Sequence, residues 1–228
     1  MLLHLKKVLN TEEVSRARNL LGAEAGWIDG RRSAGTQAVQ SKHNQQLAQD
    51  SPAAGPLQAL VLQALHQDPV FLSAALPRKV YPPQFNRYGA PGEHYGAHID
   101  SAILHDAAHG TWVRSDLSCT VFLANPEDYD GGELCVHDSW GQRRIKLPAG
   151  DAVLYPGTQV HEVTPVTRGV RLASFLWIES MVRADDQRHL LFDMDMNLLA
   201  LRQRHGETAE TVALTGTYHN LLRMWAQT

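Results

Sequence analysis

The stretch VHEVTPVTRGVRLASFLWI, residues 160–178, decides the fold class. Two runs rich in valine, leucine, isoleucine and phenylalanine, residues 160–166 and 170–178, flank Thr167-Arg168-Gly169. A three-residue loop that ends in glycine is a common connection between antiparallel strands. The stretch therefore predicts a β-hairpin.

This predicted hairpin also orients two polar side chains. If its loop is symmetric about Arg168, His161 lies opposite Phe175, and His161 and Arg171 point to the same face because side chains alternate along a strand. The offset of four residues corresponds to about 13 Å along the strand. A one-residue shift in register would break the arrangement.

Further short segments with strand composition surround the hairpin, and no helical segment lies between them. Short antiparallel strands in this number favour a sandwich or jelly roll over a parallel α/β sheet. The predicted strands are residues 78–85, 98–100, 117–122, 133–137, 143–147 and 152–155.

Helical periodicity appears on both sides of the strand-rich region. We predict a helical N-terminal segment, residues 1–77, that packs on the core, and a core domain over residues 78–180. Residues 181–228 are predicted to form two helices, each with a stripe of apolar side chains. Such apolar stripes usually pack against the core, and the alternative is a subunit contact in a homo-oligomer.

Composition excludes several function classes. The net charge of −3 provides no electrostatic case for binding nucleic acid or a membrane surface. Cys119 and Cys135 form no CxxC or zinc pattern and read as buried thiols. Lysines interrupt the apolar N-terminus, so no signal peptide is expected, and no apolar run approaches the ~20 residues of a membrane span. We expect a soluble protein in the reducing cytoplasm.

A candidate metal site combines His98-Ile99-Asp100 with His161. Two imidazoles and one carboxylate are the ligands of non-haem Fe(II) oxygenases, which leave the other iron positions open. On a strand, His98 and Asp100 share a face. A second His-x-Asp pair, His66 and Asp68, follows a helical apolar run and is interpreted as a solvated helix end.

Four more residues are candidates for binding small molecules. Arg171 suits a carboxylate, because a guanidinium binds one bidentately, although a surface ion pair is its alternative role. Tyr88 or Tyr95 could donate a hydroxyl to the same carboxylate, or simply pack. Residues 101–116 read as a long loop of the kind that covers active sites, and Trp112 is the aromatic residue expected to touch substrate.

Several motifs together resemble the PKHD-type hydroxylases, a family of prolyl-4-hydroxylase-like Fe(II)/2-oxoglutarate dioxygenases. The resemblance spans roughly residues 78–180, and the helical flanks are similar too. The motifs are NRY (86–88), GEHYGAHID (92–100), GGEL (131–134), GDAVLYP (150–156) and VHEVTPVTRGVR (160–171).

This resemblance implies an α+β fold whose core is a double-stranded β-helix, that is, a cupin-like jelly roll. It implies Fe(II) at His98, Asp100 and His161, 2-oxoglutarate at Arg171, O2 as co-substrate, and L-ascorbate to keep the iron reduced. The expected reaction is hydroxylation of a substrate with release of succinate and CO2.

Two functions stay open on the sequence. The first is the 2-oxoglutarate oxygenase. The second is a cupin-like metalloprotein that uses the same ligands without 2-oxoglutarate, as another dioxygenase or a binding module. Arg171 discriminates between them, because only the first needs it. The primary substrate, a peptide residue or a small metabolite, is not indicated.

Overall fold

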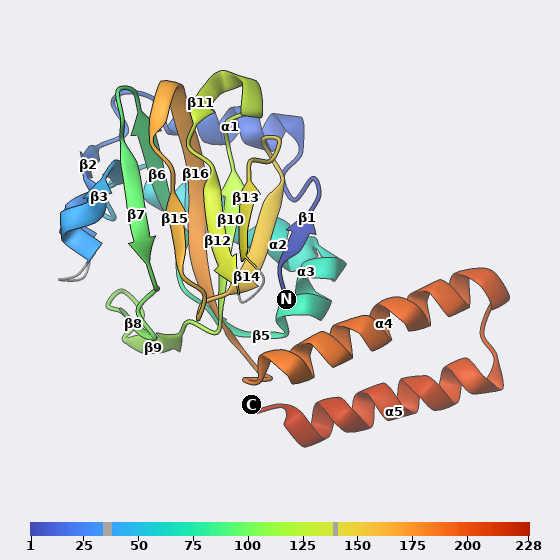
Figure 1. The fold of residues 1–228 in the computed structure, drawn as a ribbon. Helices are drawn as coiled ribbons and strands as arrows, with labels where there is room; N and C mark the ends of the chain where they lie inside the picture. Colours follow the sequence, from blue (N-terminus) through green and yellow to red (C-terminus); the bar gives the residue numbers. More distant parts are fainter. Residues whose placement is uncertain (34–37, 139–140) are drawn as a thin grey trace.

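Two antiparallel sheets face each other in the computed structural model, which describes residues 1–33, 38–138 and 141–228 (Figure 1). Within these residues, the larger sheet has the order β1-β14-β10-β16-β6-β4-β2, and β5 and β11 also pair with β16. The smaller sheet has the order β13-β12-β15-β7-β3, and β8 and β9 form a separate hairpin. The α+β jelly-roll prediction is confirmed.

Strands and helices are interspersed up to α3, strands β5 to β16 follow, and two helices end the chain. The helices are α1 (Thr11–Leu20), α2 (Ala54–Gln67), α3 (Pro69–Ala75), α4 (Asp185–His205) and α5 (Ala209–Trp225), with short 3-10 turns at Gly30–Ser33, Ala38–Ser41 and Pro126–Asp128. The strands are β1 (Leu3–Leu5), β2 (Trp27–Asp29), β3 (Lys42–His43), β4 (Gln45–Leu47), β5 (Pro77–Val80), β6 (Gln84–Gly89), β7 (His94–His98), β8 (Ile103–Asp106), β9 (Thr111–Arg114), β10 (Leu117–Phe122), β11 (Tyr129–Gly131), β12 (Leu134–Asp138), β13 (Gly141–Ile145), β14 (Ala152–Pro156), β15 (His161–Val163) and β16 (Val166–Ser180).

Side chains from both sheets fill the space between them. This inner core includes Phe122 and Val153 from the larger sheet and Leu134, Val136 and Val163 from the smaller one. Because alternate residues of a strand point to opposite faces, Val153 faces inward while its neighbours Ala152 and Leu154 face outward. The cavity described below lies in this inner layer.

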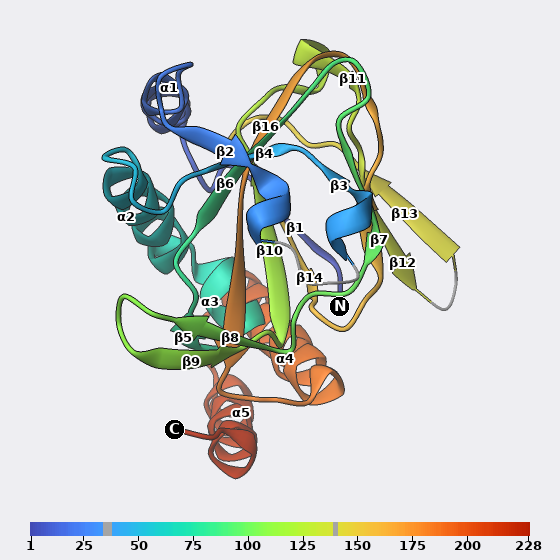
Figure 2. The ribbon, with the colours of Figure 1, turned by 90° about the vertical axis from the view of Figure 1, so that its left-hand side faces the viewer.

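Helices α1, α2 and α3 cover the outer face of the larger sheet (Figure 2). Leu57, Val61 and Leu65 of α2 share one face through i, i+4 spacing, and all three are buried in this second core. A capping box opens α1: Asn10 accepts from the Glu13 amide and its own amide donates to the Glu13 carboxylate. The larger sheet is therefore buried on both faces, which makes it a rigid support for the site.

The N-terminal segment differs from its predicted helical character. Residues 1–77 contain α1–α3, but they also supply β1, β2 and β4 to the larger sheet and β3 to the smaller one. These strands are only two or three residues long, so no alternating pattern could reveal them. Residues 101–116 are also not a plain loop, because Ile103–Asp106 and Thr111–Arg114 pair as a β-hairpin.

The predicted hairpin of residues 160–178 is wrong. Strand β15 pairs with β7 and β12 in the smaller sheet, whereas β16 pairs with β6 and β10 in the larger one. Thr164 and Pro165 form the corner between the sheets. Gly169, expected to close a loop, lies inside β16 with φ +71°, and a Cβ there would come within 2.0 Å of the Asp128 carbonyl oxygen. Glycine thus permits the close approach of β11 and does not mark a turn.

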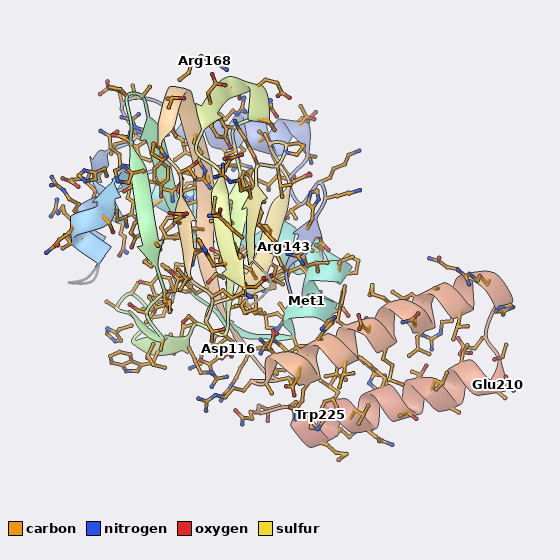
Figure 3. All side chains as sticks on the ribbon, viewed as in Figure 1. Met1, Asp116, Arg143, Arg168, Glu210 and Trp225 are labelled. Atoms are coloured by element: carbon orange, nitrogen blue, oxygen red, sulfur yellow. The ribbon has the colours of Figure 1, made fainter. Side chains whose placement is uncertain are left out.

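The helices α4 and α5 form an antiparallel hairpin that projects from the sandwich (Figure 1). Figure 3 places Trp225 near the base of this hairpin and Glu210 at its tip, away from the sheets. At the base, Leu191 and Trp225 pack with Leu76 and Val182. Among the described residues, no helix is long and apolar enough to span a membrane.

Candidate metal and co-substrate site

The backbone brings the three predicted metal ligands together. His98 ends β7 and lies directly opposite His161 of β15, with the two ring centroids 4.3 Å apart. Asp100 follows two residues after His98, just beyond the strand. One ligand atom from each of the three side chains lies within 4.8 Å of the other two. This spacing suits a single ion held by two imidazole nitrogens and one carboxylate oxygen.

Backbone carbonyls select the tautomer of both histidines. Nδ1 of His98 lies 2.8 Å from the Gly96 carbonyl oxygen, and Nδ1 of His161 lies 3.1 Å from that of Gln159. Because a carbonyl only accepts, each Nδ1 must carry the proton. Each Nε2 then presents a lone pair toward the shared space, as metal-binding histidines require.

Asp100 is held by a hydroxyl from the larger sheet. The Ser118 Oγ donates a hydrogen bond of 2.6 Å to Oδ2 of Asp100, and this oxygen lies 3.7 Å from Nε2 of His161. Ser118 lies on β10, so the carboxylate is anchored across the gap between the two sheets. Such a partner orients a ligating carboxylate and limits its rotation.

The imidazole of His98 is adapted to stay neutral. Burial, together with the smaller effect of the adjacent His161, lowers the pKa of His98 from 6.5 to about 4. Only a neutral imidazole can donate a lone pair to a metal. At neutral pH Nε2 of His98 therefore carries no proton that must leave before an ion can bind there.

A cavity of about 500 Å³ connects the triad with Arg171. The guanidinium of Arg171 is 2 % exposed, and its Nη1 donates to Oδ1 of Asn86 at 3.4 Å. Its Nε has no hydrogen-bond partner, and no ion pair found among the described residues includes Arg171. A buried cation without a carboxylate costs free energy, so this residue fits an anion that enters the cavity.

Tyr88 and Tyr95 both line this cavity. Tyr88 is the cross-strand partner of Arg171, and the guanidinium lies 5.3 Å from its ring centroid. Burial raises the pKa of Tyr88 to about 12 and raises that of Tyr95 as well. Both phenols thus keep their protons at neutral pH and can donate hydrogen bonds. The Tyr95 ring is stacked 3.6 Å from the His98 ring.

The structure adds cavity residues that the sequence did not single out. Ser118, Asn86 and Lys42 line the cavity, as does Tyr155, whose ring contacts the His161 ring edge-on at 5.2 Å. Tyr155 belongs to the GDAVLYP motif, and its inward direction follows from strand alternation with Val153. Lys42 had no such signal, because its strand has only two residues.

Trp112, the aromatic residue expected to touch substrate, is not among the described residues that line the cavity. Its side chain is 59 % exposed on β9, and its ring contacts the ring of His105 on β8 in a tilted arrangement, with centroids 4.5 Å apart. Strand alternation is the reason, since the neighbouring Val113 takes the inward direction and is 1 % exposed. Leu104 is the residue of this hairpin that lines the cavity.

The second His-x-Asp pair is a pair of helix-end residues, as predicted. His66 lies in the last turn of α2, and Asp68 caps α3 by accepting from the amides of Val70 and Phe71. The pair therefore lies outside the cavity.

Sequence patterns of two known groups match the chain. Residues 83–179 match the 2OG-Fe(II) oxygenase superfamily, and residues 185–227 match the PKHD-type hydroxylase C-terminal domain. A PKHD-type hydroxylase of Verminephrobacter eiseniae is 58% identical over 228 residues, which is 100% of both chains. A PKHD-type hydroxylase of a Polaromonas species is 57% identical, again over the whole of both chains.

Solved structures share the fold at low sequence identity. A Pseudomonas putida prolyl-4-hydroxylase aligns with TM-score 0.51 and 21% identity over 78% of this chain and 92% of its own. A Trichoplax adhaerens prolyl hydroxylase, in complex with a hypoxia inducible factor peptide fragment, aligns with TM-score 0.55 and 16% identity over 83% and 86%. At these identities the likeness shows the fold alone.

Proposed function

This chain belongs to the PKHD-type hydroxylase family and is an Fe(II)- and 2-oxoglutarate-dependent oxygenase, and from this membership we propose the residues that form its active site. His98, Asp100 and His161 hold the iron. Arg171 binds the distal carboxylate of 2-oxoglutarate, and Tyr88 and Tyr95 donate hydrogen bonds within the same cavity. Bound iron, with 2-oxoglutarate and O2, supplies the oxidation that hydroxylates the substrate and releases succinate and CO2.

One observation supports the co-substrate assignment above the others. Arg171 is a buried guanidinium with an unpartnered Nε, and it lines the same cavity as the triad. A dicarboxylate could reach both the iron and this guanidinium. Its distal carboxylate would accept two parallel hydrogen bonds from the planar guanidinium of Arg171.

The remaining residues orient the reacting groups. Backbone carbonyl oxygens bonded to Nδ1 of His98 and of His161 orient both rings so that each Nε2 lone pair faces the shared space. The Ser118 hydroxyl orients the Asp100 carboxylate. With Asp100 as an anionic oxygen ligand beside the two imidazoles, the protein itself would supply three ligands to the iron. Leu134 and Val163 contribute apolar side chains to the lining of the same cavity.

The alternative, a cupin-like metalloprotein that works without 2-oxoglutarate, explains less of the site. It accounts for the triad, but not for the buried cation of Arg171. An enzyme without a carboxylate co-substrate would leave this charge uncompensated inside the protein.

Three further proposals rest on weaker support. We propose L-ascorbate as the reductant that keeps the iron in its Fe(II) state, from the resemblance to the family alone. We propose a reducing, cytoplasmic location, which suits the buried free thiols of Cys119 and Cys135. The primary substrate is proposed as either a peptide residue or a small metabolite.

A homo-oligomer formed by the C-terminal helices is also proposed. The hairpin of α4 and α5 projects from the sandwich (Figure 1), and several of its apolar side chains are exposed. These include Leu190, Leu199, Val212, Leu214 and Met224. A second copy of the chain could bury them.

An anaerobic titration tests the co-substrate assignment. The Fe(II) protein is mixed with 2-oxoglutarate, and the metal-to-ligand charge-transfer band is recorded. We expect a saturable band in the wild type that needs a higher 2-oxoglutarate concentration in Arg171→Met. An iron-loaded wild type without any band would contradict the assignment and favour the cupin-like alternative.

A further inference from the structure

Lys42 lies in the same cavity as the proposed iron ligands. It sits on β3 directly opposite Tyr95 of β7, so the two side chains point to the same side of the sheet. Although lysine is rarely buried, Lys42 is 5 % exposed and lines the cavity. Its position is set by the edge strand that closes the smaller sheet.

Gln46 and Tyr95 both contact the ammonium of Lys42. Its Nζ donates to Oε1 of Gln46 at 2.9 Å and lies 4.8 Å from the centroid of the Tyr95 ring. The same Tyr95 ring is stacked on His98. The ring of Tyr95 thus contacts both this cation and a member of the triad, and all three side chains line one cavity.

Burial of this charge changes the pKa of the Lys42 amine. It lowers the pKa of Lys42 from 10.5 to about 8, against the opposing attraction of Asp100 and Asp29. At neutral pH the group therefore remains mostly protonated. A cation kept in a substrate cavity at this cost is suited to meet an anion there.

The charges in the cavity point to a further anion. Among its described lining residues, Asp100 is the one acidic side chain, whereas Lys42 and Arg171 are both cationic. With Fe(II) bound, Lys42, Arg171 and the iron together carry four positive charges. Asp100 and dianionic 2-oxoglutarate together carry three negative charges. The loaded cavity therefore retains one positive charge, which a monoanionic substrate would neutralise.

We propose that Lys42 binds a carboxylate of the primary substrate and holds that substrate beside the iron. The substrate class is a molecule with a carboxylate, either a free acid or an acidic residue of a peptide. This inference rests on the proposed function, because it takes Arg171 as the co-substrate residue. Gln46, Gln49 and Gln84 line the same cavity and offer amide hydrogen bonds to the rest of the substrate.

Matched acid and amide probes test this inference. The protein is loaded with Zn(II) and saturating 2-oxoglutarate, so that no turnover occurs, and binding is followed by saturation-transfer NMR. One arm compares hexanoate with hexanamide, and the other compares a capped peptide containing glutamate with its glutamine counterpart. The first arm reports a free acid and the second an acidic peptide.

Three variants accompany the wild type. Lys42→Met keeps the side-chain length and removes the charge, whereas Lys42→Arg keeps the charge. Lys79→Met is the matched control, because Lys79 donates to the Trp112 carbonyl oxygen outside the cavity. We expect the wild type to bind the acid about tenfold or more tightly than the amide in at least one arm, as a desolvated charge pair allows. This preference for the acid over the amide should vanish in Lys42→Met and persist in Lys42→Arg and Lys79→Met.

A second readout needs no variant. In the wild type, the bound acid should slow reductive methylation of the Lys42 amine, measured by peptide mass spectrometry, and the amide should not. The inference is overturned if the wild type shows no acid preference in either arm, or if the preference survives in Lys42→Met. It is also overturned if Lys42→Met loses 2-oxoglutarate binding as strongly as Arg171→Met, since Lys42 would then serve the co-substrate.

The charge-transfer titration separates the two proposals. A normal wild-type band together with no acid preference rejects the role of Lys42 and leaves the co-substrate site intact. A missing band rejects both, because the inference depends on bound 2-oxoglutarate.

Discussion

His161 and Arg171 line one cavity from opposite sheets, although they are close in the chain. His161 pairs across to His98 in the smaller sheet, and Arg171 pairs across to Tyr88 in the larger one. The corner at Thr164 and Pro165 turns the chain from one sheet to the other. The proposed metal ligands and the proposed co-substrate residue thus line the same cavity from the two facing sheets.

Arg171→Met should weaken 2-oxoglutarate binding without unfolding the protein. Loss of a charge-assisted pair costs roughly 2–3 kcal/mol, while removal of a buried cation that lacks an acidic partner leaves the free energy of unfolding unchanged or higher. Isothermal titration and denaturant unfolding measure the two effects. Arg168→Met is the control, because Arg168 is exposed on the same strand and pairs with Asp130 at 2.7 Å. Strong destabilisation of Arg171→Met with normal 2-oxoglutarate binding would assign Arg171 a structural role.

Ser118→Ala should reduce metal affinity by about 10–100-fold, because Asp100 would lose the hydroxyl that orients its carboxylate. Anaerobic Fe(II) titration of the metal-free protein measures this. Ser174→Ala is the control: its hydroxyl is equally buried and bonds the Gln84 carbonyl oxygen at 3.1 Å. Equal affinity in Ser118→Ala and the wild type would show that this hydrogen bond does not prepare the site.

The stability that Lys42 contributes should rise with pH between about 8 and 10.5. In this window the folded protein has released the Lys42 proton while the unfolded chain still holds it, so the unfolded state binds more protons and stability increases with pH. The wild type should gain roughly 3 kcal/mol relative to Lys42→Met across the window. Denaturant unfolding of both metal-free proteins at a series of pH values provides the difference. A difference that stays constant with pH would mean that the folded protein does not depress the pKa of Lys42.

The C-terminal hairpin should mediate self-association. Leu199 of α4 is 44 % exposed and Val212 of α5 is 58 % exposed, so replacing each with aspartate would place charge on the proposed contact. Light scattering coupled to gel filtration should show a dimer or larger assembly for the wild type and a monomer for the double variant. The charge-transfer titration should be the same for both. A monomeric wild type would disprove the contact.

The three metal-binding candidates and Arg171 could be named from the sequence because their residue types restrict the chemistry. Two histidines with a nearby aspartate suggest a metal, and the surrounding motifs resemble one family. The argument that placed His161 and Arg171 on one face was nevertheless wrong, since it assumed a hairpin that does not exist. The two residues meet because inward positions of two facing sheets meet, which strand alternation alone cannot reveal.

Other parts of the site depend on contacts that no local pattern encodes. Lys42 reaches the cavity from a two-residue strand, and Ser118 meets Asp100 across the sheets. The exposure of Trp112 is likewise set by the β8–β9 hairpin, which buries the neighbouring Val113, and its contact with substrate stays a prediction.

The sequence by itself determined the fold class, the family and the residue types that can hold iron and a carboxylate, since these depend on composition, periodicity and motif. The tertiary structure alone decided which sheet each strand joins, which hydroxyl holds Asp100 and which cation shares the cavity with the triad. The physical reason is that strand pairing is non-local. Most ladders of the two facing sheets join segments distant in the chain, and the side chains that meet are selected by packing between the sheets rather than by their neighbours in sequence.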